Sequence, residues 1–301
     1  MPNGTSPQIL VDGLHFPEGP RWRTTAPGEG KLWFVDILAG KVMAVDLSGS
    51  VETIAEVNVP VGLGFTTDGT LLVTSPPEGK LLALRDGAQE TVADVRAATG
   101  YVCGEMVVDD LGRAFFGGGD PSILSNFDES IPPGPGNMPN FGFLMHVDTA
   151  TGQTQVVADR MTFPNGAVVT PDGKTLIVAE TFGFRLTAFD IQDGGTLANR
   201  RIWADLGVPP DGICLDQEGC VWVAAIYYLY GGAGGYIRVE EGGQVLDRID
   251  VEGYSPYACT LGGPEMKTLF LCESAILGLP RNPGDGRIRT IEVEVAGTGS
   301  P

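Results

Sequence analysis

Histidine is scarce in this sequence, because its 301 residues contain only His15 and His146. Two imidazoles cannot build a zinc site of three histidines. They also leave little for a Ser-His-Asp hydrolase, and the sequence has no G-x-S-x-G nucleophile turn. A Walker phosphate loop is absent, and no G-x-G-x-x-G follows a strand-like segment. The sequence therefore disfavours the histidine-based hydrolases, kinases and dehydrogenases.

Positive charge is scarce as well, with 19 lysines and arginines against 38 acidic residues and a net charge of −19. This charge repels phosphate backbones and anionic lipid, so we expect no nucleic-acid or membrane partner. No apolar run reaches the roughly 20 residues of a membrane span. The five cysteines form no C-x-x-C, and residues 1–7 lack the charged and apolar regions of an export signal. These features predict a cytoplasmic protein, a monomer or homodimer, acting on a small-molecule substrate.

Glycine and proline are abundant, with 44 and 22 residues, which indicates many tight turns between short strands. One phrase recurs six times at roughly 40-residue spacing, the spacing of propeller blades: a tight turn, a hydrophobic strand, a second turn and an alternating strand. It predicts an all-β fold, a six-bladed β-propeller with four antiparallel strands per blade around a central channel. We expect one domain over residues 1–301, with an insertion at about 119–140 in the third blade. The segment 8–11 is expected to pair with the last blade near 291–293 and close the fold.

Aligning the blades on their turn glycines identifies the residues that start the inner strands. Asn165 and Asp211 stand eight residues before the turn glycines Gly173 and Gly219, and Glu18 holds the corresponding place in the first blade. In a propeller these places converge at one mouth of the channel. Two carboxylates and one amide form a hard-oxygen set that suits Ca²⁺, Mg²⁺ or Mn²⁺ and leaves positions for water and substrate. The alternative is that these residues only cap turns.

Four motifs then resemble the senescence-marker-protein/gluconolactonase/luciferin-regenerating family, in order and over essentially the whole chain. They are Phe16-Pro17-Glu18-Gly19-Pro20, Phe163-Pro164-Asn165-Gly166, Pro210-Asp211-Gly212-Ile213 and Ala258-Cys259-Thr260-Leu261-Gly262-Gly263-Pro264. The resemblance implies a six-bladed propeller that binds a divalent metal through Glu18, Asn165 and Asp211 and hydrolyses lactones or esters. Ca²⁺ is expected first, with Mg²⁺, Mn²⁺ or Zn²⁺ as alternatives. Asp211 is then also the candidate general base for the attacking water.

The third blade departs from the family pattern. Gly104 stands where the family commonly has Asn, and Val102 stands where its sugar-lactone members have Arg. Glu105 is a candidate catalytic residue that would replace the lost oxygen ligand; the alternative is a solvated or Arg-paired carboxylate. Glu180, after a strand of the fourth blade, is a further catalytic candidate, with an ion pair to Arg185 as the alternative.

Aromatic residues are expected around the pocket. The candidate substrate residues are Val102, Gly104, Phe182, Tyr227, Tyr230 and Tyr257, although aromatics also serve core packing. The resemblance implies a metal-dependent hydrolase that opens a lactone or ester, and Val102 with the tyrosine-rich loop favours a relatively apolar small molecule as its substrate. The 119–140 insertion is a candidate lid. Two alternatives stay open: a cyclisation or rearrangement of secondary metabolism on the same scaffold, and a binding propeller without chemistry.

Overall fold

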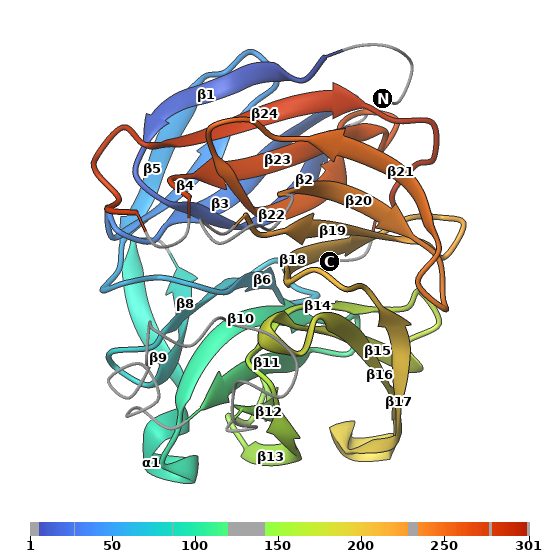
Figure 1. Cartoon of the computed structure of the whole chain (residues 1–301). Coiled ribbons are helices and arrows are strands. Elements are labelled where there is room, and N and C mark those ends of the chain that lie inside the picture. Colours follow the sequence, from blue (N-terminus) through green and yellow to red (C-terminus); the bar gives the residue numbers. More distant parts are fainter. Residues whose placement is uncertain are drawn as a thin grey trace. The chain divides into compact units, whose positions relative to one another are not determined.

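The computed structural model describes residues 6–26, 28–85, 87–119, 142–227, 234–276 and 279–299. The chain forms two compact units, the first from residues 1–60 and 211–301 and the second from residues 61–210. Six four-stranded antiparallel sheets, three for each unit, make up the fold (Figure 1). The fold is a six-bladed β-propeller, and the sequence-based prediction is confirmed.

The first unit holds blades one, five and six. Blade one consists of β2 (Pro17–Ala26), β3 (Glu29–Asp36), β4 (Lys41–Val45) and β5 (Val51–Glu56). Blade five consists of β18 (Pro210–Leu215), β19 (Val221–Ala225), β20 (Gly235–Val239) and β21 (Val245–Asp250). Blade six consists of β22 (Ser255–Gly262), β23 (Thr268–Ser274), β24 (Gly286–Glu292) and β1 (Gln8–Leu14). As expected, the first strand closes the last blade, because β1 pairs antiparallel with β24 and Gln8 lies opposite Thr290 (Figure 1).

The second unit holds blades two, three and four. Blade two consists of β6 (Leu63–Phe65), β7 (Leu71–Ser75), β8 (Lys80–Arg85) and β9 (Ala88–Asp94). Blade three consists of β10 (Val102–Val108), β11 (Arg113–Gly119), β12 (Gly142–Asp148) and β13 (Thr154–Met161). Blade four consists of β14 (Pro164–Val169), β15 (Thr175–Glu180), β16 (Arg185–Ile191) and β17 (Leu197–Asp205). The two short 3₁₀ turns η3 (Thr181–Gly183) and η4 (Asp193–Gly195) belong to this last blade.

A short helix, α1 (Val95–Thr99), follows β9, although the sequence suggested no helix. Its ends explain why it forms. Asp94 caps the N-terminus by accepting the N–H of Ala97 at 2.8 Å, and Gly100 ends the helix in the left-handed conformation. One buried valine, Val95, anchors it. In the part of the chain that the structure describes, no helix is both long and apolar enough to cross a membrane.

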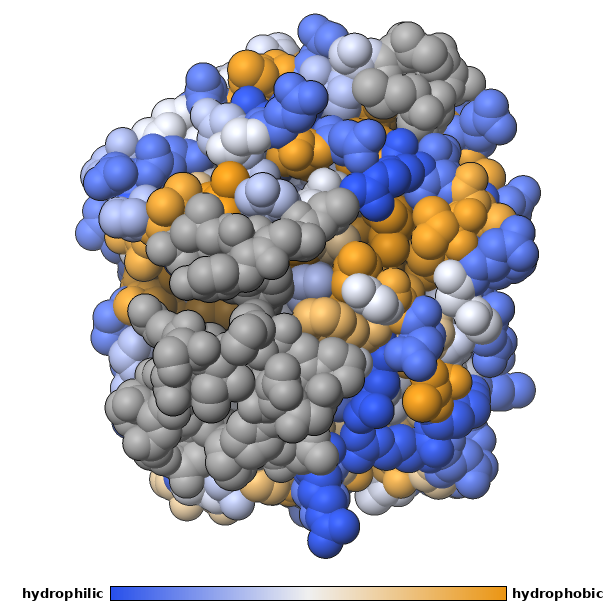
Figure 2. All heavy atoms as spheres, in the orientation of Figure 1, coloured by the Kyte–Doolittle hydropathy of each residue, from blue (hydrophilic) through white to orange (hydrophobic). Residues whose placement is uncertain are grey.

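Burial decreases across each blade. The strand at one end of the sheet is largely buried, as in β10 and β18, and the strand at the other end is largely exposed, as in β13 and β21. We call the buried end strand the inner strand: β2, β6, β10, β14, β18 and β22. The outer strand β17 illustrates the other extreme, with mostly hydrophilic residues over it in Figure 2. Functional side chains at the starts of inner strands therefore rest on well-packed elements.

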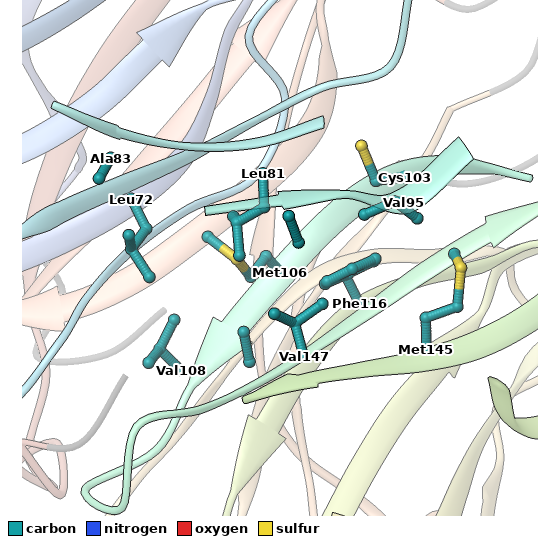
Figure 3. Packing of buried hydrophobic residues seen from close by; sticks show 12 residues of the cluster. Leu72, Leu81, Ala83, Val95, Cys103, Met106, Val108, Phe116, Met145 and Val147 are labelled. Atoms are coloured by element: carbon teal, nitrogen blue, oxygen red, sulfur yellow. The ribbon is translucent and has the colours of Figure 1, made fainter. Parts of the chain in front are cut away.

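Neighbouring blades of the second unit share one hydrophobic core. Figure 3 shows Leu72 and Leu81 of blade two in one cluster with Met106, Phe116 and Val147 of blade three. All five side chains are at most 1% exposed. Burial of each such side chain contributes about 1.5 to 3 kcal/mol, so the apolar strands identified in the sequence hold the blades against each other.

His146 on β12 is buried in blade three. Its Nδ1 lies 3.2 Å from the amide nitrogen of Gln155, and its ring lies 5.2 Å from that of Phe115. Gly195 packs so closely that a β-carbon built on it would lie 2.5 Å from Nε2 of His146. Burial, followed by the positive charge of Arg113, lowers the pKa of His146 below its usual 6.5. The imidazole is therefore neutral in the folded protein at pH 7.

We expect the protein to lose stability as the pH falls below about 6.5, because the unfolded chain then protonates His146 and the folded chain resists it. Above this pH the imidazole is neutral in both states and contributes no pH dependence. The slope from one group is at most about 1.4 kcal/mol per pH unit. Urea unfolding between pH 7 and pH 5 measures it, and His146→Gln should flatten the dependence. An unchanged slope in this variant would show that His146 is not the group responsible. The nearby carboxylates of Asp148 and Asp109 act in the opposite direction and raise the pKa of the imidazole.

Candidate functional site

A β-bulge stands at the start of several inner strands. The register of β2 shifts between Glu18 and Arg21, and that of β14 shifts between Pro164 and Ala167. The shift in β10 brackets Gly104 and Glu105, and the shift in β22 brackets Tyr257. A bulge twists a strand locally and redirects its side chains, and bulges are frequent beside active sites. The sequence predicted the strand starts but not the bulges; in β2 and β14 the only signal was a polar residue followed by glycine.

Glu18 lies at the bulge of β2. Its side chain is only 7% exposed, and Oε2 accepts the N–H of Gly19 at 2.9 Å. Gly19 has a φ of 57°, a conformation that glycine adopts without steric cost. The Glu-Gly pair therefore places a buried carboxylate where the inner strand begins.

Asp36, at the end of β3, holds the segment that leads into Glu18. Its carboxylate accepts the backbone N–H of His15 at 2.9 Å and of Phe16 at 2.8 Å. Ile37 donates its N–H to the carbonyl of Phe16 at 2.9 Å. Nothing in the sequence singled out Asp36, because a carboxylate after an apolar strand looks like an ordinary turn residue.

Asp211 lies near the start of β18 and is 5% exposed. The following residue, Gly212, allows β18 to approach β22: a β-carbon built on it would lie 2.6 Å from Cα of Ala258 and 3.0 Å from the carbonyl oxygen of Tyr257. Glu18 and Asp211 thus both lie in the first unit, each buried at the start of an inner strand.

Asn165 lies at the bulge of β14 in the second unit. Its Nδ2 donates to Oγ1 of Thr181 at 3.3 Å, which leaves the amide oxygen as the acceptor end of the side chain. The segment before it is held as in blade one, since Glu180 accepts the N–H of Thr162 at 2.7 Å and Thr181 donates its N–H to Phe163. The three predicted metal ligands belong to different units, Glu18 and Asp211 to the first and Asn165 to the second. That they meet at one cation therefore stays a prediction.

Glu180 is a fully buried ion-pair centre. Arg185 donates to it at 3.0 Å and 3.1 Å, and Arg200 at 3.2 Å, while Thr187 donates at 2.5 Å. The ion pair with Arg185 that the sequence suggested is present, but the carboxylate is buried rather than at the surface. Burial would raise the pKa of Glu180, yet the hydrogen bonds from Arg185 and Thr187 lower it below its usual 4.5. These contacts suit a positioning residue better than an acid or base that exchanges protons.

The third blade places its candidate residues on β10. Glu105 is buried there, beside Gly104, whose carbonyl accepts the hydroxyl of Thr74 at 2.8 Å. Val102 opens the strand opposite Gly119 and is partly exposed. The structure therefore puts these three residues at one strand start of the second unit.

The candidate aromatic residues belong to both units. Phe182 is buried in η3 with its ring 4.9 Å from that of Phe163. Tyr227 follows β19 and donates its backbone N–H to the hydroxyl of Ser255 at 2.9 Å. Tyr230 lies outside the described residues, as does the 119–140 insertion beyond Gly119.

Tyr257 belongs to a cluster that the sequence did not reveal. Its ring packs edge-on against Phe16 at 4.7 Å, and its hydroxyl donates to the carbonyl of Ala275 at 2.7 Å. Nη2 of Arg281 donates to the same hydroxyl oxygen at 2.8 Å. Burial raises the pKa of Tyr257, although the charge and the hydrogen bond of Arg281 lower it in part; the negative charge of Asp211 raises it by a smaller amount. We call Phe16, Tyr257 and Arg281 the Arg281 cluster; no repeat or motif marks Arg281 in the sequence.

The donor set fits a hard divalent cation. Glu18 and Asp211 supply carboxylates that are almost completely buried, and Asn165 supplies an amide oxygen whose nitrogen is already engaged. Oxygen-only donors of this kind suit Ca²⁺, Mg²⁺ or Mn²⁺. Among the residues that the structure describes, no three His, Cys, Asp or Glu side chains gather as an alternative metal site.

Comparison with known proteins identifies relatives along almost the whole chain. Residues 16–275 match the family described as the SMP-30/Gluconolactonase/LRE-like region. The chain is 26% identical over 263 residues to 6-deoxy-6-sulfogluconolactonase of Pseudomonas putida, covering 85% of this chain and 82% of that protein. It is 27% identical over 275 residues to regucalcin of Xenopus laevis, covering 87% of this chain and 84% of that protein.

A solved structure shows the same fold. A calcium-binding protein, regucalcin, of Agrobacterium tumefaciens matches with a TM-score of 0.77 and 21% sequence identity, covering 99% of this chain and 96% of that chain. This likeness extends the sequence match to the architecture of the whole chain.

Proposed function

Because the chain belongs to the SMP-30/Gluconolactonase/LRE-like family, we propose that it is a divalent-metal-dependent hydrolase that opens a lactone or ester of a relatively apolar small molecule. Family membership and the match to a sulfogluconolactonase indicate lactone hydrolysis. The observation that carries the proposal is the pair of buried carboxylates, Glu18 and Asp211, at the starts of two inner strands of one unit. Burying charged carboxylates is costly, and a bound cation offsets this cost.

Glu18, Asn165 and Asp211 would hold the cation. The cation, when bound, polarises a carbonyl and lowers the pKa of water. Asp211 accepts the proton of the attacking water as general base. Asp36 and Glu180 keep the segments before Glu18 and Asn165 in place through backbone hydrogen bonds. Ca²⁺ is the first candidate because regucalcin is a relative, with Mg²⁺, Mn²⁺ or Zn²⁺ as alternatives.

The apolar character of the substrate rests on side-chain chemistry. Val102 and Gly104 offer no charged or amide group at the start of the third blade. Glu105, buried beside them, is proposed to supply the oxygen that Gly104 lacks. Phe182, Tyr227, Tyr230 and Tyr257 are the proposed aromatic contacts of the substrate.

Location and partners follow from charge and cysteine chemistry. All five cysteines are free and buried, which supports a reducing compartment such as the cytoplasm. The net charge of −19 disfavours nucleic acid and anionic membranes as partners. The chain is proposed to act as a monomer or homodimer on its small substrate.

A lactone panel with metal removal tests the proposal. We expect dihydrocoumarin, an apolar aromatic lactone, to be opened at least about tenfold more efficiently than glucono-1,5-lactone. Val102 and Gly104 provide no polar side chain for the hydroxyl groups of the sugar lactone, and the loss of one hydrogen bond changes binding by about this factor. EDTA should abolish turnover and added Ca²⁺ should restore it. Full activity in EDTA would contradict metal dependence. Retained metal binding without opening of any lactone or ester would instead favour a cyclisation or rearrangement, which Val102 and Gly104 also allow.

A further inference from the structure

We propose that Arg281 binds an anionic group of the substrate, a carboxylate, beside Phe16 and Tyr257 in the first unit. The proposal rests on the proposed function for the reaction that this substrate undergoes, but anion binding itself requires neither metal nor hydrolysis. Arg281 comes from the segment between β23 and β24, which no family motif or repeat singled out.

The guanidinium of Arg281 is held in a defined orientation. Its Cζ lies 4.3 Å from the ring centre of Phe16 and 5.1 Å from that of Tyr257, and Nη2 donates to the Tyr257 hydroxyl at 2.8 Å. Tyr257 is itself fixed by its hydrogen bond to the carbonyl of Ala275. A guanidinium stacked on aromatic faces keeps its edge N–H groups for planar acceptors such as carboxylates. The cluster therefore preorganises a cation at little further entropic cost.

Arg281 lacks the counter-charge that comparable arginines have. Five other partly buried arginines pair with a buried carboxylate: Arg113 with Asp109, Arg185 with Glu180, Arg238 with Asp216, and Arg287 and Arg289 with Glu273. The residues that the structure describes provide no such carboxylate for Arg281, and its buried Nε meets no acceptor among them. In a chain with twice as many acidic as basic residues, a partly buried arginine without a carboxylate indicates that the charge serves a ligand.

The cluster lies beside the two candidate carboxylates of the same unit. Phe16 stands two residues before Glu18, and the backbone of Tyr257 packs against Gly212, next to Asp211. Arg281 remains partly exposed, so a ligand can reach it. A substrate whose lactone or ester carbonyl lies near Glu18 and Asp211 can thus present an anionic substituent to Arg281, with its apolar body against Phe16 and Tyr257.

The probes for the test are benzoate and its neutral isostere benzamide. Both are titrated calorimetrically, at millimolar concentrations and in EDTA, into the full-length protein and its variants. EDTA removes any metal that would bind benzoate, so the result does not depend on the proposed hydrolase. We expect wild-type protein to bind benzoate at least about tenfold more tightly than benzamide, because hydrogen bonds to charged groups are the stronger ones. Arg281→Gln should remove this preference while benzamide binding persists.

Two further variants complete the test. Arg201→Gln on β17 makes the same change in net charge and should keep the benzoate preference. Arg281→Lys retains the positive charge but not the planar guanidinium, and it should keep only part of the preference for benzoate over benzamide. This variant keeps the proposal testable if Arg281→Gln does not fold. Equal binding of benzoate and benzamide by the wild type would overturn the proposal. So would a preference that survives in Arg281→Gln, or a loss of stability in that variant without a change in preference.

Discussion

Asp211→Asn is expected to lower kcat by at least about a thousandfold. The substitution removes the candidate general base, which contributes about 10² to 10⁴, and one of two charged ligands of the proposed cation. Because the amide has nearly the shape of the carboxylate, the start of β18 and its packing on β22 should remain as they are. The measurements are kcat and kcat/KM on the best lactone of the panel, together with Ca²⁺ affinity by calorimetry.

The melting temperature separates lost chemistry from lost folding. Without metal, the Asp211→Asn variant should melt no lower than the wild type, since the amide buries no negative charge at the start of β18. Asp12→Asn on β1, an exposed aspartate of the same unit, is the matched control and should retain full activity. An active Asp211→Asn variant would rule out Asp211 as base.

Glu180→Gln is expected to destabilise the protein by about 3 kcal/mol. The buried carboxylate accepts from Arg185, Arg200 and Thr187 as well as from the backbone of Thr162. Removing one partner of a buried pair leaves the remaining charge uncompensated, at a cost of about 3 to 5 kcal/mol. The lower end applies because both arginines keep contact with solvent. Urea unfolding at pH 7 measures the difference.

A surface ion pair provides the contrast for this experiment. Glu52 pairs with Lys31 at 2.6 Å, and both side chains are exposed. Glu52→Gln should therefore cost less than about 1 kcal/mol. If Glu180→Gln and Glu52→Gln were equally stable, the buried ion pairs of Glu180 would not stabilise the protein as expected. A Glu180→Gln variant that lost turnover but no stability would return Glu180 to the catalytic candidates.

The fold could be predicted because one pattern of turns and strands recurs six times in the sequence. Each blade repeats the same alternation of turn glycine and apolar strand, so the strand starts at Asn165 and Asp211 could be located from spacing, and the start at Glu18 from its corresponding place in the first blade. The closing pair β1 and β24 followed from the need to leave no open edge. Helix α1 was not predicted, because its five residues contain too few apolar positions to show a helical period.

The surroundings of the site were less predictable, since they depend on contacts between distant segments. Asp36 acts through backbone N–H groups of His15 and Phe16, which leave no trace in residue type. Arg281 meets Phe16 and Tyr257 only after blades one and six have packed together. Periodicity identifies the start of a strand, but it does not tell which side chain from another blade reaches it.

The pairing of β1 with β24 also sets an order on biosynthesis. Among the described strands, β1 is synthesised first and its partner β24 last, so β1 lacks its hydrogen-bonding neighbour until the other five blades have been made. Until β24 has been made, β1 cannot join blade six and presents an unprotected edge to wrong partners. Mispairing of β1 during synthesis is therefore prevented only when β24 becomes available to pair with it.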